Sequence, residues 1–452
     1  MTIASTLTTL APAFSGQLLQ PADTGYDDAR RVHNGLVDKR PALIARCRGL
    51  ADVADAVKIA RTSNLEIAVR GGGHNVGGRG TIDGGMMIDL ATMKGIHVHP
   101  ARRTARAQGG VLWKEFNRET QLHGLATTGG VVGTTGIAGL TLGGGLGWLM
   151  PKYGLALDNL LSAEMVMADG SVRRAAADEN PDLYWAIRGG GGNFGVAASL
   201  EYALHPVGPM IAGGLVAHPL QNARNVLRFF RETCATLPDE MMLAAGLLTA
   251  PDGSGNKLVG ILAAHCGSLA DGEAAVTPIK RFGPPVMDAM GPISYCQQNG
   301  LIDASLPKGA LNYWKSHFLV DLTDDCIGAL VDAFSAAPSP MSQIVIEHFH
   351  GAASRVPVTD TACSMRVTGF NVVIVSQWMD PKENDRHIAW CRSVYSTLGP
   401  YLGTTRYVNY LDHDEADAAA IAYGPNYARL RDLKTKFDPE NIFHINVNVR
   451  PS

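Results

Sequence analysis

The sequence predicts an α+β protein that contains two different kinds of sheet. Before about residue 206, a strand, a helical segment and a second strand are expected at 41–46, 52–62 and 65–69, an order typical of parallel pairing. After residue 206, apolar strands alternate with helical stretches, as in an antiparallel sheet that carries helices. In addition, 51 of the 452 residues are glycine, and 28 of these lie between Gly71 and Gly195. Such a concentration without a repeating period indicates loops that approach something closely.

The first half of the chain contains short elements that can be placed in order. The apolar strand at 65–69 leads directly into Arg70 and the three glycines that follow it, so this loop lies at the carboxyl end of a strand. Open α/β sheets bind their ligands at that position. Further elements are expected as strands at 86–90, 96–99 and 104–107, a helix at 111–120, a hairpin at 165–174, and a helix from Pro181 to about Gly189.

The second half is expected to consist of strands at 241–249, 257–264, 343–349 and 370–377, with helices at 223–234 and 384–398. On the strand at 343–349, Val345 and Glu347 share one face, whereas His348 and His350 point to the other. An acid and two histidines on an otherwise apolar strand are costly to bury unless they are paired, so this strand is a candidate for function. The tail brings polar and aromatic residues back around an expected helix at 427–437.

The composition excludes several classes of protein. Lys and Arg minus Asp and Glu is 39 − 42 = −3, which gives no electrostatic footprint for nucleic acid. No apolar run reaches the roughly 18 residues of a membrane span, and the first residues lack the basic start and apolar core of a signal peptide. Seven cysteines without a CxxC spacing suit a reducing compartment. We therefore expect a cytoplasmic protein with neither a nucleic-acid nor a membrane partner.

Three kinds of site could use clustered glycines. A P-loop is excluded because the chain contains no GxxxxGK[S/T]. The run at 190–195 matches GxGxxG, but a dinucleotide site needs a helix after this motif and an acid about 20 residues later. Residues 211–218 contain no acid. The remaining explanation is a cofactor held between several glycine-rich loops, whose N–H groups bind phosphate or ring oxygens.

Four runs of residues occur in a fixed order along the chain: RGGGHN at 70–75, GGVVGTTGIAGLTLGGGLGWLMPKYGLALDN at 129–159, NPDLYWAIRGGGGNFGV at 180–196, and YVNYLDHD with FDPENIFHINVNV at 407–449. They resemble the flavin-linked oxidases of the vanillyl-alcohol oxidase superfamily, and more narrowly its berberine-bridge-enzyme-like branch with the bacterial hydroxynicotine oxidases and polyketide-tailoring flavoenzymes. The resemblance implies a split FAD-binding domain of the PCMH type around a central antiparallel-sheet domain. The FAD-binding domain would then comprise 1–206 and 405–452, and the substrate-binding domain 207–404.

The resemblance also implies how FAD is held. The histidine that closes the RGGGH run carries the flavin covalently in that family, and this position is His74 here; a histidine that only hydrogen-bonds a phosphate is the alternative. Some members carry a second link from a cysteine at the position of Val132, so a single link is expected. The residues implied to bind FAD are Arg70, Gly71, Gly72, Gly73, His74, Asn75, Gly129, Val132, Thr134, Thr135, Gly136, Gly139, Leu140, Gly143, Gly144, Gly147, Asn193, Val196, Asn446 and Asn448.

The reaction implied by the resemblance is removal of a hydride from a C–H next to oxygen or nitrogen, or an oxidative ring closure. The substrate would be a small or medium alcohol, amine or polyketide-like molecule, and O2 would reoxidise the flavin. Thr135, which lines the oxygen route in the berberine-bridge-like branch, neither plainly opens nor plainly blocks that route. The alternatives are a mono- or oligosaccharide oxidase, a dehydrogenase with another acceptor, and a flavin-binding protein without activity. A monomer or homodimer is expected.

A base or hydrogen-bond partner is needed for the substrate's hydroxyl or amine proton. Tyr153 and Tyr410 match positions where family members place active-site tyrosines. Many relatives carry Glu or Gln at a strand position that is Val373 here, so that role is either absent or taken by a neighbouring strand, with Glu347 and His348 as candidates. A Glu–His structural pair is the alternative to catalysis. No metal site is expected, since no third ligand accompanies the histidines of this strand.

Overall fold

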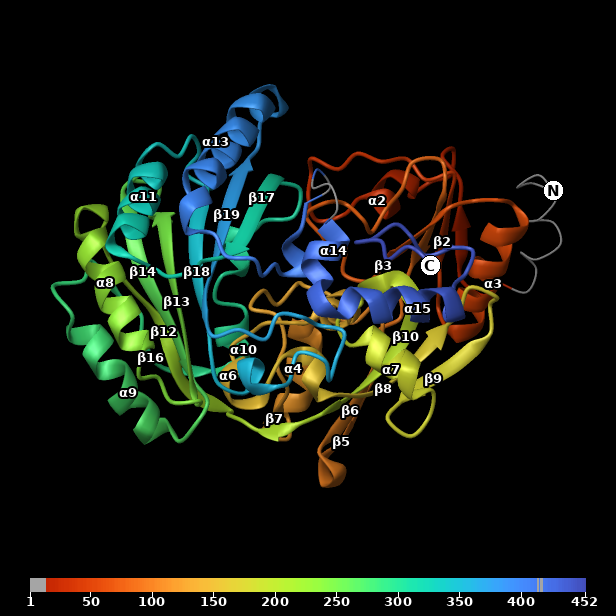
Figure 1. Ribbon diagram of the computed structural model, residues 1–452, viewed down its shortest axis with the longest axis horizontal. Coiled ribbons are helices and arrows are strands. Elements are labelled where there is room, and N and C mark those ends of the chain that lie inside the picture. The colour runs from red at the N-terminus through yellow and green to blue at the C-terminus, as the bar shows by residue number, and fades with distance from the viewer. Residues whose placement is uncertain (1–13, 413, 415–417) are drawn as a thin grey trace.

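The computed structural model describes residues 14–412, 414 and 418–452, and every structural statement below concerns these residues. The chain folds into two halves that face each other (Figure 1). One half contains a four-stranded and a five-stranded sheet, and the other contains an eight-stranded sheet, which lies on the left of Figure 1 with its helices. This mixture of helices with parallel and antiparallel sheets confirms the α+β prediction.

The four-stranded sheet carries the first glycine-rich loop. Its strand order is β1 (Gln17–Leu19), β2 (Leu43–Arg46), β4 (Met86–Asp89), β3 (Ile67–Arg70). Strands β2, β4 and β3 are parallel, and α3 (Leu50–Thr62) connects β2 to β3 with Val57 fully buried against the sheet. The predicted strand–helix–strand unit is therefore confirmed, and Arg70 is the last residue of β3 before the glycines.

The five-stranded sheet is antiparallel and has the order β5 (Ile96–His99), β6 (Thr104–Gln108), β10 (Val196–Ala203), β8 (Leu160–Val166), β9 (Val172–Ala176). Its central strand, β10, begins directly after the glycine run at 190–195. A dinucleotide-binding motif would open a helix at this point. The structure therefore excludes the dinucleotide interpretation of that run for a second reason, which is that a strand follows it.

The eight-stranded sheet is antiparallel and has the order β15 (Met287–Asp288), β12 (Met210–Pro219), β14 (Lys257–His265), β13 (Met241–Thr249), β18 (Gln343–Phe349), β19 (Gly369–Trp378), β17 (Leu311–Phe318), with β16 (Gly291–Ser294) on β12. Four helices pack on its outer face: α8 (Ala223–Cys234), α9 (Leu269–Arg281), α11 (Asp324–Ser335) and α13 (Asn384–Thr397). Ile344 and Ile346 point from β18 into this apolar layer. The alternate residues of β18 therefore face the other half of the molecule.

Short elements connect the sheets. They are α2 (Tyr26–Arg30), α4 (Trp113–Gln121), β7 (Leu125–Ala126), α5 (Ile137–Gly143), α6 (Met150–Tyr153), α7 (Pro181–Ile187), β11 (His205–Pro206), α10 (Tyr295–Asn299), α12 (Ala352–Arg355), α14 (Ala418–Tyr423) and α15 (Tyr427–Phe437). Helix α7 begins at Pro181 as predicted, and α15 has the predicted bounds. None of the helices formed by the described residues has the length and apolar character needed to cross a bilayer.

The C-terminal segment returns to the first half and is anchored there by a buried ion pair. Lys434, on α15, and Asp438 are both completely buried, with 2.6 Å between Nζ and Oδ2. The ammonium group also donates to the carbonyl oxygens of Asn193 (2.7 Å) and Phe443 (3.0 Å). The pair therefore joins the third glycine-rich loop to the segment that follows α15, with every ammonium proton bonded.

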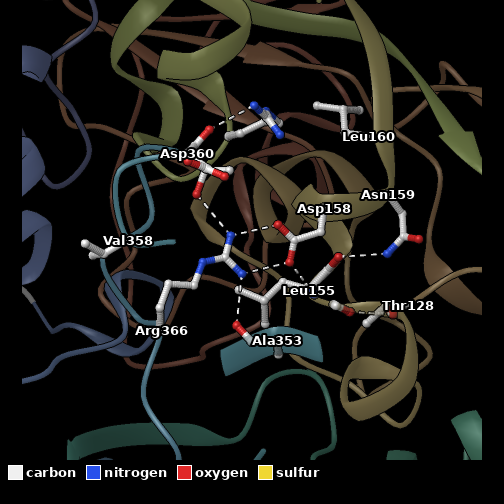
Figure 2. Close-up of polar contacts among 12 residues, drawn as sticks. Thr128, Leu155, Asp158, Asn159, Leu160, Ala353, Val358, Asp360 and Arg366 are labelled. Atoms are coloured by element: carbon white, nitrogen blue, oxygen red, sulfur yellow. Dashed lines mark hydrogen bonds and ion pairs between the residues drawn. The ribbon is translucent and has the colours of Figure 1, made fainter. Parts of the chain in front are cut away.

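A second ion pair ties the two halves together (Figure 2). Arg366 donates to both carboxylate oxygens of Asp158, at 2.8 and 2.7 Å, and to the carbonyl oxygen of Ala353 at 3.1 Å. Arg366 lies between β18 and β19, whereas Asp158 ends the second glycine-rich run. Because Asp158 also accepts the N–H of Leu155 (2.8 Å), this contact holds the end of that run in place.

Replacing Asp438 by Asn should destabilise the fold by about 3–5 kcal/mol, because the buried Lys434 ammonium then loses its counter-charge. The matched control is Asp182→Asn, which removes the carboxylate from an exposed pair with Lys436 (2.9 Å). That change should cost at most about 1 kcal/mol. Urea unfolding followed by circular dichroism measures both variants. Equal losses of stability would contradict the anchoring role of the buried pair.

Candidate functional site

A cavity lies between the glycine-rich loops and the inner face of the eight-stranded sheet. Residues from the segments 70–76, 130–146, 191–197 and 443–447 line its first wall. The facing wall is formed by strands β17, β18 and β19 through Trp314, Gln343, Val345, Glu347, Val373 and Val375. The cavity therefore lies where the three glycine-rich runs meet the polar strand at 343–349.

Backbone contact between two glycine-rich loops shapes the cavity. A Cβ atom on Gly72 would overlap the backbone nitrogen of Gly136, and one on Gly136 would overlap the nitrogen of Gly72. Neither position therefore accepts a larger residue without movement of the backbone. The next residue, Gly73, has a φ of +70°, a left-handed conformation that glycine adopts without strain. The loop turns there and presents His74 to the cavity.

His74 lies between two threonines and a second histidine. Its Nε2 atom is 2.9 Å from Thr134 Oγ1, and its Nδ1 atom is 3.4 Å from Thr135 Oγ1. The ring of His33 stacks on it, with 4.0 Å between the ring centroids and 24° between the planes. Burial, followed by the charges of His33 and Lys308, lowers the pKa of His74 to about 3. The imidazole is therefore uncharged at neutral pH.

The two polar residues that flank the glycines also line the cavity, and each has a structural partner. Arg70 binds Asp89 through two hydrogen bonds (3.0 and 2.6 Å) and donates to the carbonyl oxygen of Arg31 (2.8 Å). The Oδ1 atom of Asn75 accepts the N–H of Arg79 (3.2 Å). Arg70 thus holds the loop on β4, and Asn75 closes the turn that follows.

The residues predicted to bind FAD fall into two groups. One group lines the cavity and consists of Arg70, Gly71, Gly72, Gly73, His74, Asn75, Val132, Thr135, Gly136, Gly139, Leu140 and Asn446. Thr134 touches this group through its contact with His74. The other group does not line the cavity and consists of Gly129, Gly143, Gly144, Gly147, Asn193, Val196 and Asn448.

Several glycines of the second group allow close packing behind the cavity wall. A Cβ atom on Gly129 would overlap the ring of Trp113, and one on Gly147 would overlap the carbonyl oxygen of Gly129. A Cβ atom on Gly143 would overlap the side chain of Asn409. These positions require glycine because neighbouring groups occupy the space, and a bound molecule is not needed to explain them.

Asn193 and Val196 also serve the wall from behind. The Nδ2 atom of Asn193 donates to the carbonyl oxygens of Gly190 (2.8 Å) and Val447 (3.0 Å), and its Oδ1 atom accepts the N–H of Val449 (2.9 Å). Asn193 therefore joins the third glycine-rich loop to the C-terminal segment. Val196 begins β10 and lies in the apolar core beside the parallel sheet.

A buried carboxyl group and a tyrosine meet on the facing wall. Tyr410 donates its hydroxyl to Glu347 Oε1 (3.1 Å), and Asn371 Nδ2 donates to Glu347 Oε2 (2.8 Å). Burial raises the pKa of Glu347 to about 7, because the charged form loses its hydration. Burial and the neighbouring carboxylate raise the pKa of Tyr410 well above its ordinary value. At neutral pH the tyrosine keeps its proton, and the carboxyl group is present in both its protonated and its charged form.

Val373 lies on the same wall as this carboxyl group. In the register of β18 and β19, Val345 pairs with Val373 and Glu347 pairs with Asn371. Val345, Glu347 and Val373 all line the cavity. The acid therefore lies on the strand next to the one that carries Val373, as one of the two alternatives expected. Its role in catalysis stays a prediction.

Tyr153 and His348 lie outside this cavity. Tyr153 is on α6, where its ring stacks on His205 with 3.9 Å between centroids and 11° between planes. His348 lies on the face of β18 opposite Glu347, because side chains alternate along a strand. It stacks on His350 (4.7 Å), and burial lowers its pKa to about 3. The structure therefore does not bring either residue together with Glu347.

Some residues that line the cavity are missing from the predicted set. His33 lies in a polar stretch before β2, where the sequence contains no recognisable signal for its stacking on His74. Trp314 lines the wall beside Tyr410, with 6.2 Å between ring centroids. Asn409 donates to the carbonyl oxygen of Leu140 (3.0 Å) and joins the tail to the second glycine-rich loop. Its position next to Tyr410 is the signal that could have identified it.

Replacing Gly72 by Ala should destabilise the fold by at least about 2 kcal/mol, because the added methyl group meets the backbone of Gly136, which cannot rotate away. Gly291, in β16, is the control, since an added Cβ there has no neighbour within 4 Å. Gly291→Ala should change stability by less than about 1 kcal/mol. Thermal unfolding measures both variants. If Gly72→Ala unfolds at the temperature of the control, the two loops do not approach as closely as described.

Comparison with known proteins identifies the family. A family described as "FAD binding domain" matches residues 41–176, and one described as "Berberine and berberine like" matches residues 406–450. An FAD-linked oxidoreductase of Dictyostelium discoideum is 32% identical over 416 residues, which are 91% of this chain and 89% of the relative. The (R)-6-hydroxynicotine oxidase of Paenarthrobacter nicotinovorans is 30% identical over 451 residues, which are 97% of each chain.

A solved structure gives the same result. The crystal structure of 6-hydroxy-D-nicotine oxidase from Arthrobacter nicotinovorans has a TM-score of 0.89 and 29% sequence identity, and the match covers 97% of this chain and 98% of that one. Both matched family segments contribute residues to the cavity described above. The resemblance noted in the sequence is therefore confirmed. The chain belongs to the berberine-bridge-enzyme-like family of FAD-linked oxidoreductases and is an FAD-dependent oxidoreductase.

Proposed function

We propose that this protein is an oxidase that carries FAD on a single bond to His74. It removes a hydride from a C–H group next to nitrogen or oxygen of a small or medium organic substrate, and O2 accepts the electrons. One observation carries the proposal: an uncharged His74 and the buried Glu347–Tyr410 pair line the same cavity. In this proposal residues 1–206 and 405–452 form the FAD-binding domain, and 207–404 form the substrate-binding domain.

The residues of the cavity fit FAD. Gly139 has open space where a side chain would stand, and Gly192 has only the Asn446 amide near that space, at 3.8 Å. Asn446 Nδ2 donates to the carbonyl oxygen of Phe443, whereas its Oδ1 atom is buried without a hydrogen-bond partner among the described residues. A buried acceptor on a cavity wall calls for a donor from a bound molecule. Bound FAD supplies a ring system that accepts a hydride.

The surroundings of His74 support a covalent bond rather than a hydrogen bond to phosphate. Only an uncharged imidazole has a nitrogen lone pair that can form a bond to carbon, and burial keeps His74 uncharged. Val132 lines the same cavity and has no thiol to offer. These two side chains together support one link rather than two.

The Glu347–Tyr410 pair is the proposed acceptor of the substrate's proton. A substrate N–H or O–H that hydrogen-bonds to Tyr410 Oη can transfer its proton through that hydroxyl to Glu347 Oε1, 3.1 Å away. The wall around the pair is largely apolar, with Val345, Val373 and Val375 at its surface. Such a wall suits an organic amine or alcohol with few other polar groups.

Two further features support the proposed electron acceptor and the proposed location of the enzyme. The relative at 30% identity is an oxidase by name, which supports O2 as the electron acceptor. All seven cysteines are free thiols, and six of them are buried, which supports a cytoplasmic location.

The covalent bond is tested by acid precipitation. The purified protein should be yellow, and the colour should precipitate with the polypeptide, because acid unfolds the chain without breaking a C–N bond. His74→Ala should leave the flavin in the supernatant. Val132→Ala changes a neighbouring cavity residue without touching the link, so its colour should stay in the pellet. A wild-type pellet without flavin, measured by absorbance, would exclude the covalent bond.

The proposed base is tested by the pH dependence of flavin reduction. The carboxylate form of Glu347 exists above its pKa, so the anaerobic rate of flavin reduction should rise as the pH increases through about 7. Glu347→Gln should lower this rate by roughly 10²-fold or more and remove the dependence. Glu201→Gln changes a partly buried acid on β10 that accepts a hydrogen bond from Ser162, and it should leave rate and profile unchanged.

The measurement uses stopped-flow absorbance with a panel of amines and alcohols that includes (R)-6-hydroxynicotine, and the best substrate serves for the pH series. An unchanged pH profile in Glu347→Gln would exclude Glu347 as the proton acceptor. Reduction by none of the panel would contradict the proposed substrate class.

A further inference from the structure

We propose that His33 is a positioning residue for attachment of the flavin: its ring covers one face of His74 and holds that imidazole, with the two threonine hydroxyls at its edges, in the orientation that bonds to the cofactor. This inference rests on the proposed covalent bond at His74. His33 itself lines the cavity. No motif in the sequence marks it, and its partner lies 41 positions further along the chain (74 − 33 = 41).

The stack is built from fixed parts of the backbone. The N–H of His33 donates to the carbonyl oxygen of Gly73 (2.9 Å), and the carbonyl oxygen of His33 accepts the N–H of Gly309 (2.9 Å). The backbone of His33 is therefore held through both its N–H group and its carbonyl group. Because Gly73 directly precedes His74, the same hydrogen bond keeps the two histidines side by side, and their ring centroids lie 4.0 Å apart.

The next residue extends this anchor to the second half of the molecule. Asn34 Nδ2 donates to the carbonyl oxygens of Val76 (2.8 Å) and Asn312 (2.9 Å), and its Oδ1 atom accepts the N–H of Asn312 (2.9 Å). Asn34 is 3% exposed. The segment with His33 is thus held between the first glycine-rich loop and β17. The backbone that carries the His33 ring cannot move away from His74 without breaking hydrogen bonds to both.

The edges of the His74 ring are held by hydroxyl groups of the second glycine-rich loop. Thr134 Oγ1 lies 2.9 Å from Nε2, while Thr135 Oγ1 lies at a longer 3.4 Å from Nδ1. When Nε2 carries the ring proton and donates it to Thr134, Nδ1 keeps the lone pair that a bond to carbon requires. A face contact and an edge contact together leave the ring little freedom to rotate, which is the requirement for a bond formed at one defined atom.

Burial, and after it the basic residues nearby, favour the neutral form of His74. His33 and Lys308 both act to lower its pKa, in addition to burial. On the neighbouring strand, Arg70 is paired with Asp89 at 2.6 Å. His33 has its own pKa lowered to about 4, by burial and then by Lys308, so the stack is uncharged at neutral pH. Removing the ring of His33 would admit water to the face of His74.

The bond itself can be written with its atoms and electrons balanced. A C–N bond forms between the imidazole and the 8α-methyl carbon of the flavin, and one C–H bond of that methyl group and the imidazole N–H bond are broken. The two protons and two electrons so released remain on the flavin ring, which is thereby reduced. O2, the acceptor of the proposed reaction, then takes them up as hydrogen peroxide. The imidazole proton, which is one of these two, would leave Nε2 through the hydroxyl of Thr134 before it reaches the flavin.

The test compares His33→Ala with His33→Phe, which keeps an aromatic face over His74. Apoprotein made in flavin-starved cells is mixed with FAD, and acid-stable flavin is measured against time between pH 5.5 and 8.5. Phe282→Ala is the control, because it removes an equivalent stack on the outer helices (Phe229–Phe282, 4.1 Å, 15°). Thermal unfolding and the non-covalent affinity for FAD are measured for each variant.

We expect His33→Ala to attach flavin at least about ten-fold more slowly at pH 7, because an imidazole that is free to rotate is rarely aligned. Its rate should fall further towards pH 5.5, because the solvated His74 regains an ordinary pKa and is protonated in acid. His33→Phe and Phe282→Ala should attach flavin within about three-fold of the wild-type rate, because an aromatic ring still holds His74 in its alignment. Their attachment rates should not depend on pH.

Three results would overturn the inference. His33→Ala could attach flavin at the wild-type rate, His33→Phe could be as slow as His33→Ala, or Phe282→Ala could be equally slow, which would indicate a general loss of stability. Acid-stable flavin that is missing even from the wild type would instead defeat the covalent bond and this inference with it. That failure is seen in the wild-type protein alone, so the two are distinguishable.

Discussion

The contact of backbone against backbone at Gly72 and Gly136 is the constraint on which the cavity depends. With no Cβ atom between them, the first two glycine-rich loops lie close enough for His74 to reach Thr134 and Thr135. A side chain at either glycine would separate the loops and remove those contacts. Gly147 packs equally closely on the backbone of Gly129 behind the wall. The many glycines therefore allow close packing as well as access to the cavity.

Loops with few side chains need other means to stay in place, and buried polar anchors provide them. Arg70 and Asp89 hold the first loop, Asp158 with Arg366 holds the second, and Lys434 with Asp438 holds the third. Each pair is largely or fully buried and is further bonded to backbone groups, the condition under which a buried ion pair does not destabilise the fold. The three ion pairs therefore hold in place loops whose glycines would otherwise leave the backbone flexible.

Much of this architecture could be predicted from local patterns, whereas the site could be predicted only in part. The strand Gln343–Phe349 and the helix Ala223–Cys234 have the predicted bounds because their apolar periodicity reports burial directly. The same alternation placed Glu347 and His348 on opposite faces, but it does not say which face meets a cavity. The stacking of His33 on His74 depends on two distant segments meeting. Whether a glycine lines the cavity or packs behind it depends on its spatial neighbours, which no spacing in the sequence records.

The cavity wall includes residues from segments 70–75 and 443–447, which are separated by most of the chain. At roughly 5–20 residues per second, a ribosome takes on the order of twenty seconds to a minute between them. During that interval the first glycine-rich loop can fold on its parallel sheet, but Asn446 and Phe443 have not yet been made. The first wall can therefore form on the ribosome, whereas the wall that contains Asn446 can be added only when the chain is nearly finished. Because one wall comes from the end of the chain, the complete cavity is a late product of the synthesis of this enzyme.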